Sequence, residues 1–161
     1  MIELGCGDVP LGTEMAEDLR ESCISCVKRI ACTDYSSVCI DALKKQFSTS
    51  AQPHEEQNIL EFKQADAREL PYAGSSFELV LEKGTLDAML SDEKKGKENC
   101  VRIVSECARI LTSPGFIVLV SHLNAHEQKG LDWLESVVFQ GRRKGASSAA
   151  WKIEVHGKDA S

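Results

Sequence analysis

The chain has 161 residues, of which 42% are hydrophobic and 27% are charged. This length is sufficient for one domain, residues 1–161, with its own hydrophobic core. Acidic residues outnumber basic ones by 25 to 19, a net charge of −6, whereas nucleic-acid-binding proteins present a basic surface. No apolar run is long enough to span a membrane, and no secretion signal is visible. We therefore expect a cytoplasmic protein without a nucleic-acid or membrane partner.

Hydrophobic patterning predicts strands and helices that alternate along the chain. Short apolar or alternating segments predict strands at residues 1–4, 27–33, 58–64, 77–82, 116–121 and 151–156. Helices are predicted at residues 13–21, 36–47, 99–111 and 124–139, and loops at residues 48–57, 65–76 and 140–150. Thr13 is the expected N-cap of the first helix, and Ser36 or Ser37 that of the second. The strand at 116–121 is apolar throughout, which is typical of burial on both faces.

This alternation of strands and helices indicates the class of fold. It implies a mostly parallel sheet with helices on both faces. Right-handed crossovers then give a doubly wound, Rossmann-like α/β fold. Ligands of such sheets bind beyond the carboxyl ends of the strands, close to the first strand of the chain.

Three acidic residues end or follow three successive predicted strands. Glu3 lies beside Gly5 and Gly7, Asp34 follows the second strand, and Asp66 follows the third. In a doubly wound sheet these positions meet at one crevice. A carboxylate after the second strand can accept hydrogen bonds from both hydroxyls of a ribose, and one after the third can accept from an adenine amine. Glu3 can orient the glycine loop or bind the amino group of an amino acid.

The glycine loop departs from the dinucleotide-binding fingerprint. That fingerprint, G-x-G-x-x-G, requires a third glycine where this chain has Pro10. Asp8 would also repel a pyrophosphate. The loop therefore favours a cofactor with a ribose, an adenine and an ammonium group but no phosphate, such as S-adenosylmethionine. Each motif alone has an ordinary structural interpretation, as a turn or a helix cap, and only the joint spacing favours this cofactor.

Three stretches, "LGCGD", "TDYSSVCIDAL" and "FELVLEKGTLDAML", resemble class I S-adenosylmethionine-dependent methyltransferases. "DYSS" and "EKGTLDA" are similar to the branch that methylates lysine on translation elongation factor 1-alpha, the methyltransferase-like 13 type. A mitochondrial citrate synthase lysine methyltransferase is closely related to that branch. "VSECARILTSPGFIVLVS" and "LNAH" extend the resemblance over most of the chain. It implies a class I methyltransferase fold, S-adenosylmethionine as cofactor, and a protein substrate, with elongation factor 1-alpha as the candidate.

The resemblance also implies which residues bind the cofactor. They are Gly5, Gly7, Asp34, Tyr35, Asp66, Ala67 and Lys83, and the strand-end pattern adds Glu3. The two glycines would lie along the methionine part of the cofactor. Tyr35 would pack beside the adenosine, the backbone of Ala67 would contact the adenine together with the neighbouring carboxylate, and Lys83 would line the pocket near the methyl group.

Members of this family have a segment before the glycine loop and a last strand after the segment that matches "WKIEVH". We therefore expect a sheet that is incomplete at the N-terminus and lacks its last strand, which would leave the strand at 151–156 with an exposed edge. Cofactor affinity is then expected to be weak or absent. Three functions stay open: a protein-lysine methyltransferase, a small-molecule methyltransferase, and an inactive binding module.

Other reactive residues receive no firm role from the sequence. Cys23 and Cys26 form a CxxC motif, but no second pair completes a zinc site, so we expect reduced bystander thiols and no metal. His122 and His126 are four residues apart without further ligands. Asp87 could orient a substrate amine or tether the following helix, so no catalytic residue is assigned.

Overall fold

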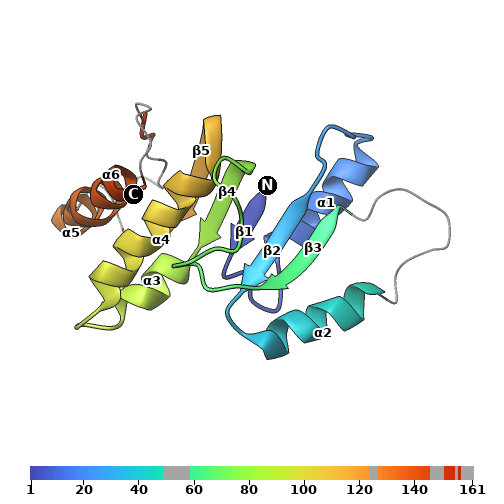
Figure 1. The fold of residues 1–161 in the computed structure, drawn as a ribbon, viewed down its shortest axis with the longest axis horizontal. Helices are drawn as coiled ribbons and strands as arrows, with labels where there is room; N and C mark the ends of the chain where they lie inside the picture. The colour runs from blue at the N-terminus through green and yellow to red at the C-terminus, as the bar shows by residue number, and fades with distance from the viewer. Residues whose placement is uncertain (49–58, 124–126, 146–150, 155, 157–161) are drawn as a thin grey trace, which may run out of the picture.

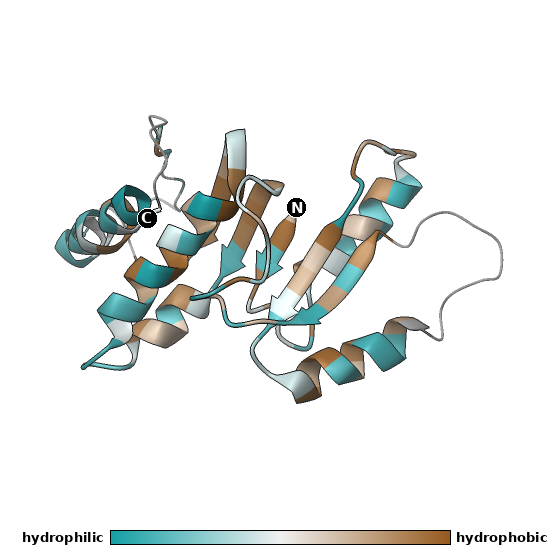
Figure 2. Cartoon of the chain, viewed as in Figure 1, coloured by the Kyte–Doolittle hydropathy of each residue, from teal (hydrophilic) through white to brown (hydrophobic). Residues whose placement is uncertain are grey.

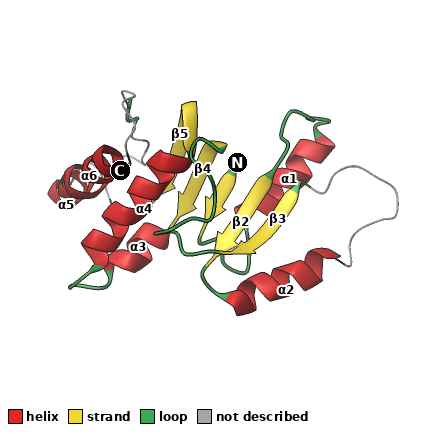
Figure 3. Cartoon of the chain, viewed as in Figure 1, coloured by secondary structure: helices red, strands yellow, loops and turns green. Residues whose placement is uncertain are grey.

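The computed structural model describes residues 1–48, 59–123, 127–145, 151–154 and 156. It contains one five-stranded sheet flanked by helices (Figure 1), and Figure 3 distinguishes the two kinds of element. The strands are β1 (Ile2–Leu4), β2 (Ile30–Asp34), β3 (Leu60–Gln64), β4 (Phe77–Lys83) and β5 (Leu111–Val120). The helices are α1 (Leu11–Glu21), α2 (Ser37–Ser48), α3 (Thr85–Leu90), α4 (Gly96–Ile110), α5 (Gln128–Trp133), the π-helix η1 (Leu134–Phe139) and α6 (Gln140–Lys144). The predicted doubly wound α/β fold is confirmed.

The strand order in the sheet is β3-β2-β1-β4-β5, and each neighbouring pair is parallel. The chain runs outward from β1 to β3 and then crosses to β4 on the other side of β1. The order therefore reverses at β1, where loops on either side diverge and leave a crevice at the carboxyl edge. In register, Glu3 of β1 lies between Cys32 of β2 and Leu81 of β4.

Each face of the sheet carries its own hydrophobic cluster. On one face, Ile2 and Val80 pack with Leu86 of α3 and Val104 of α4. On the other face, Ile30 and Cys32 of β2 pack with Ile40 and Leu43 of α2, and Met15 and Leu19 of α1 lie beside them. Figure 2 shows hydrophobic colour along most of β2 and mixed colour on α2 and α4. Central strands covered on both faces need apolar residues throughout, whereas the helices bury only one side.

The prediction that the strand at 116–121 is buried on both faces is wrong. Its side chains alternate: Phe116 is 72% exposed, Val118 44% and Val120 45%, while Ile117 and Leu119 pack against the core. β5 is the edge of the sheet. In register, Val118 continues the row of Leu81 and Glu3, on the face that carries α1. On this face of the sheet, α1 covers the strands around β2. No described element covers the same face at β5.

The C-terminal third differs from the prediction. The residues described between 127 and 139 are helical from Gln128, as expected, while 124–126 lie outside the described residues. Helix continues through α6, where a loop was predicted. Gly141 permits this, because a Cβ there would collide with Val104 of α4. The predicted strand at 151–156 is wrong for residues 151–154 and 156, which pair with no strand.

The helix boundaries follow the predictions within a few residues, with one omission. Helix α3 was not predicted, although "GTLDAML" contains it. In the described ranges, no helix combines the length and the apolar character needed to cross a membrane.

Candidate functional site

Glu3 holds the start of helix α1 from within the sheet. Its carboxylate accepts hydrogen bonds from the backbone N–H of Leu11, at 3.0 Å, and of Gly12, at 2.8 Å. The side chain is 2% exposed, and burial raises the pKa of Glu3 although the two N–H groups oppose this. Thr13, the predicted N-cap, instead donates its hydroxyl proton to Pro10. Of the two roles considered for Glu3, the structure therefore supports orientation of the glycine loop.

The two glycines of the loop have different surroundings. Both have positive φ angles, +59° at Gly5 and +62° at Gly7, a conformation that favours glycine. A Cβ at Gly5 would collide with Thr85 of α3, whose hydroxyl donates to Leu4 O at 3.1 Å. At Gly7, no described atom lies within 4 Å of a Cβ position. Gly5 therefore packs the loop against α3, whereas the space at the Cβ position of Gly7 is open among the described residues.

Asp34 ends β2 and is bonded directly to the glycine loop. Its Oδ2 accepts from the N–H of Gly7 at 3.1 Å, and its Oδ1 from the N–H of Ser36 at 2.9 Å. A carboxylate oxygen can accept two hydrogen bonds, so each oxygen of Asp34 keeps one acceptor position. The next residue, Tyr35, is 79% exposed. The carboxylate of Asp34 is therefore fixed against the loop at Gly7.

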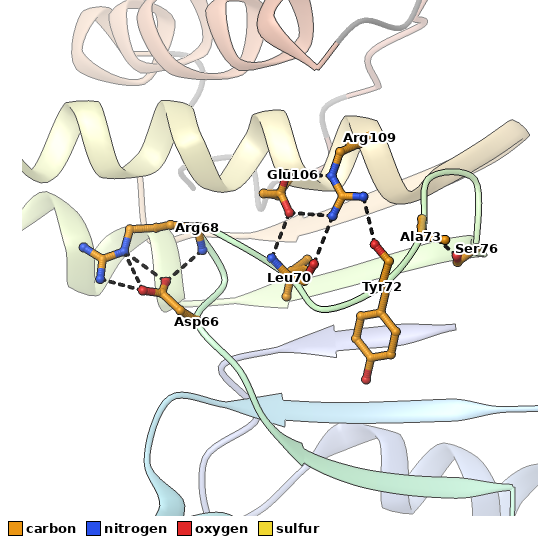
Figure 4. A network of polar contacts seen from close by, with 8 residues as sticks. All are labelled: Asp66, Arg68, Leu70, Tyr72, Ala73, Ser76, Glu106 and Arg109. Carbon is orange, nitrogen blue, oxygen red and sulfur yellow. Dashed lines mark hydrogen bonds and ion pairs between the residues drawn. The ribbon is translucent and has the colours of Figure 1, made fainter.

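Asp66 lies beyond β3, where its partner is Arg68 (Figure 4). The guanidinium contacts both carboxylate oxygens, at 2.7 to 3.1 Å, and the Arg68 N–H adds a bond of 2.9 Å. These side-chain hydrogen bonds, above all, lower the pKa of Asp66. Each oxygen therefore already accepts two hydrogen bonds, and an adenine amine would have to displace Arg68. Ala67, between them, is half-buried.

The loop that carries Asp66 is clamped to α4 (Figure 4). Glu106 accepts the N–H of Leu70 at 2.8 Å. Arg109 donates to the carbonyls of Tyr72, at 2.8 Å, and Leu70, at 3.1 Å, and forms an ion pair with Glu106 at 2.7 Å. Burial would raise the pKa of Glu106, but the bonds from Arg109 and Leu70 outweigh it and the pKa is lowered. The rim of the crevice after β3 is thus held by two side chains of one helix.

The rim after β4 begins with Lys83, whose side chain is exposed. Gly84 follows with a φ of +82° and open space at its Cβ position among the described residues. Before them, Glu82 is 1% exposed and its Oε1 accepts from the N–H of Leu86 at 3.0 Å. Burial raises the pKa of Glu82. Glu82 therefore fixes the start of α3 as Glu3 fixes the start of α1.

The thiols do not add a reactive group to this site. Cys6 and Cys32 are buried, and burial raises the pKa of Cys6 and raises that of Cys32 to about 12. Cys23 and Cys26 are exposed in the turn after α1. Within the part of the chain that the structure describes, no three His, Cys, Asp or Glu side chains are grouped as metal ligands.

Sequence reasoning missed two residues that shape the site. Arg68 saturates Asp66, and the local signal was the pair of opposite charges two residues apart in "DAR". Glu82 secures the start of α3 through the N–H of Leu86. The local signal was an acidic residue at the end of a predicted strand, four residues before Leu86. Neither partner could be identified from the sequence, because the pattern shows which charges are near in the chain but not which hydrogen bonds they make.

The residues present fit S-adenosylmethionine in its ribose and methionine parts. Asp34 keeps two acceptor positions that suit a ribose diol, and the space at the Cβ position of Gly7 is open for the chain of the methionine part. At the adenine position the fit is incomplete, because Arg68 holds both oxygens of Asp66.

Comparisons with known proteins identify the family of the chain. The family model described as "Methyltransferase domain" matches residues 2–119. The chain is 30% identical over 154 residues to "eEF1A lysine and N-terminal methyltransferase" of Xenopus laevis, covering 95% of this chain and 19% of that protein. It is 31% identical over 157 residues to the protein of that name from Mus musculus, covering 97% and 19%. It is 28% identical over 141 residues to "Citrate synthase-lysine N-methyltransferase, mitochondrial" of Danio rerio, covering 86% and 52%.

This chain thus spans about a fifth of the length of the first two relatives. Among solved structures, a SAM-dependent methyltransferase from Methanosarcina mazei superposes with a TM-score of 0.58 and 22% identity, covering 80% of this chain and 55% of that one. A TehB-like SAM-dependent methyltransferase from Corynebacterium glutamicum gives 0.59 and 16%, covering 86% and 62%. At these identities the structures show the fold alone. The matched domain and the shared fold lead to one conclusion: the chain belongs to the methyltransferase domain family, on the class I Rossmann-like fold, with S-adenosylmethionine as its cofactor.

Proposed function

We propose that this chain catalyses S-adenosylmethionine-dependent N-methylation of lysine on a protein, and that the protein is a translation elongation factor. The observation that carries the cofactor half is the Asp34 carboxylate, bonded to the loop at Gly7 with acceptor positions left on both oxygens. The substrate half is supported by the names of the relatives, which act on eEF1A lysine. An elongation factor would place the enzyme in the cytoplasm, and citrate synthase, the substrate named for another relative, in mitochondria.

In this proposal the chain's own residues position the cofactor. When bound, S-adenosylmethionine supplies a methyl group on a positively charged sulfur. Asp34 binds the ribose hydroxyls, the backbone of Gly5 and Gly7 follows the methionine part, and Tyr35 packs beside the adenosine. Glu3 acts indirectly, since its carboxylate is bonded to the start of α1.

For the adenine and the methyl group of the cofactor, we propose the same contact residues that the sequence predicts. The backbone of Ala67 contacts the adenine, and Asp66 joins it only when Arg68 yields a carboxylate position. Lys83 lines the pocket near the methyl group through its backbone, because an ammonium beside a sulfonium is unfavourable. Positioning of the two reactants is the main contribution of such a site.

The test is transfer of a radiolabelled methyl group to purified elongation factor 1-alpha and, in parallel, to purified citrate synthase. Asp34→Ala is the inactive variant, and Asp41→Ala, an exposed acid on α2, is the matched control. Label on elongation factor 1-alpha that Asp34→Ala loses and Asp41→Ala keeps supports the proposal. Label on citrate synthase alone would show that citrate synthase, and not the elongation factor, is the substrate. Label only in extracted small molecules, or none from a folded chain that binds no cofactor, contradicts the proposal.

A further inference from the structure

A second polar cluster lies beyond the ends of β4 and β5. Asp87, in the first turn of α3, accepts the hydroxyl proton of Ser121 at 2.6 Å and the backbone N–H of His122 at 3.2 Å. The ring Nδ1 of His122 lies 3.1 Å from Asp87 Oδ2. Ser121 in turn accepts the N–H of Leu123 at 3.0 Å. Three groups from the segment 121–122 therefore converge on the Asp87 carboxylate, which is only 13% exposed.

This cluster belongs to the carboxyl edge of the sheet, where the crevice lies. Lys83 pairs with Val120 in register, and the N–H of Gly84 donates to the carbonyl of Val120 at 3.1 Å. Ser121 and His122 follow at once. On the other side, α3 begins at Thr85, whose hydroxyl bonds to the end of β1. The cluster is therefore adjacent to the residues that bound the proposed methyl-transfer position.

The geometry of the pair defines the chemistry of His122. In a neutral imidazole, a carboxylate 3.1 Å from Nδ1 favours the tautomer with its proton on Nδ1, which leaves the lone pair on Nε2, at the opposite side of the ring. The His122 side chain is 74% exposed, so this lone pair is accessible. A carboxylate that orients an imidazole in this way is the usual support of a general base.

A purely structural role for Asp87 would not require the ring. Ser121 and the main-chain N–H of His122 already tether the loop to α3 through the carboxylate. The contact with Nδ1 is additional and concerns only the imidazole. Replacing His122 by alanine therefore removes the ring and keeps the tether, so the two roles can be separated.

We propose that His122 is the base that accepts the proton of the substrate lysine, with Asp87 as the positioning residue; this rests on the proposed function. The lysine ammonium gives one proton to Nε2 of His122. The freed lone pair on nitrogen forms the bond to the methyl carbon as the carbon–sulfur bond breaks, and that electron pair stays on sulfur. His122 then releases its proton to solvent. A lysine held in a desolvated position is a stronger acid than one in water, which brings it within reach of an imidazole.

The first experiment measures the ring itself, without cofactor. Long-range proton–nitrogen NMR of the full chain reports which ring nitrogen carries the proton. We expect the Nδ1-protonated form for His122 in the wild type and loss of that preference in Asp87→Asn. An Nε2-protonated ring in the wild type, or identical His122 signals in Asp87→Asn, overturns the proposal.

The second experiment measures methyl transfer to purified elongation factor 1-alpha together with cofactor binding by calorimetry. General-base contributions predict that His122→Ala lowers kcat by about a hundredfold, with an unchanged Kd for S-adenosylmethionine and partial rescue by added imidazole. His156→Ala, which removes an exposed histidine 3.8 Å from Glu154, is the matched control and keeps wild-type kcat. A His122→Ala kcat within threefold of an active wild type overturns the base and leaves the proposed function standing. A wild type that transfers no methyl group overturns both.

Discussion

The buried carboxylate of Glu3 allows the most demanding test of the fold that supports the site. Glu3→Gln preserves the size of the side chain but replaces one acceptor oxygen with a donor amide. One of the two backbone N–H groups, of Leu11 or Gly12, then loses its partner. A hydrogen bond to a charged group contributes about 1.5–3 kcal/mol, and loss of the negative charge at the helix N-terminus adds about 0.5 kcal/mol. Part of this loss in the free energy of unfolding is offset, because the substitution also removes a buried charge.

We therefore expect Glu3→Gln to lower the free energy of unfolding by about 2 kcal/mol, a large share of the roughly 5–15 kcal/mol typical of a domain. Urea denaturation followed by circular dichroism measures this quantity. Glu14→Gln is the control, because it removes an exposed charge from the first turn of the same helix, and it should change stability by less than about 0.5 kcal/mol. Equal losses for the two variants would refute the assignment of Glu3 as the anchor of α1.

Three further predictions concern the rim of the crevice and the buried acid of β4. Asp34→Ala should weaken S-adenosylmethionine binding about a hundredfold in calorimetry, since two hydrogen bonds of about 1.5 kcal/mol each are lost. Arg109→Ala should lower stability by about 2 kcal/mol and speed hydrogen exchange in the loop at 65–76, because the carbonyls of Leu70 and Tyr72 lose their donor. Glu82→Gln should flatten the pH dependence of stability: burial raises the native pKa of Glu82, so its contribution is full below the unfolded value and declines as pH rises through the native one.

Each of these has a matched control. Asp41→Ala should keep cofactor affinity, and an equal loss there would point to misfolding of α2. Lys97→Ala, an exposed cation of α4, should leave loop exchange unchanged, and unaltered exchange in Arg109→Ala would contradict the clamp. Glu78→Gln is the control for Glu82→Gln, because it replaces an exposed acid of the same strand. If the free energy of unfolding of Glu82→Gln depends on pH as in the wild type, burial does not perturb the carboxyl of Glu82.

Patterns of local sequence were sufficient for much of the fold. Alternation of apolar segments with amphipathic ones placed β1 to β4 and helices α1, α2 and α4 within a few residues. Buried strands of a parallel sheet appear as short apolar segments, and the helices that cover them show an apolar period of about 3.6 residues. The positions of Glu3, Asp34 and Asp66 at strand ends also followed from that pattern. The chain's membership of the methyltransferase domain family is confirmed by the match over residues 2–119.

Burial and hydrogen-bond partners were decided only by the tertiary structure. The apolar segment at 116–121 forms an edge strand with one open face, since its sequence cannot indicate whether a neighbour covers it. Asp66 is saturated by Arg68, and Glu3 is bonded to the start of α1, because a carboxylate binds whichever donors the fold brings near it. The contact of Asp87 with His122 joins residues 35 positions apart. The sequence thus predicted candidate residues for the chemistry. Only the tertiary structure decided which of their oxygen and nitrogen atoms already have hydrogen-bond partners, because those partners depend on which elements the fold brings together.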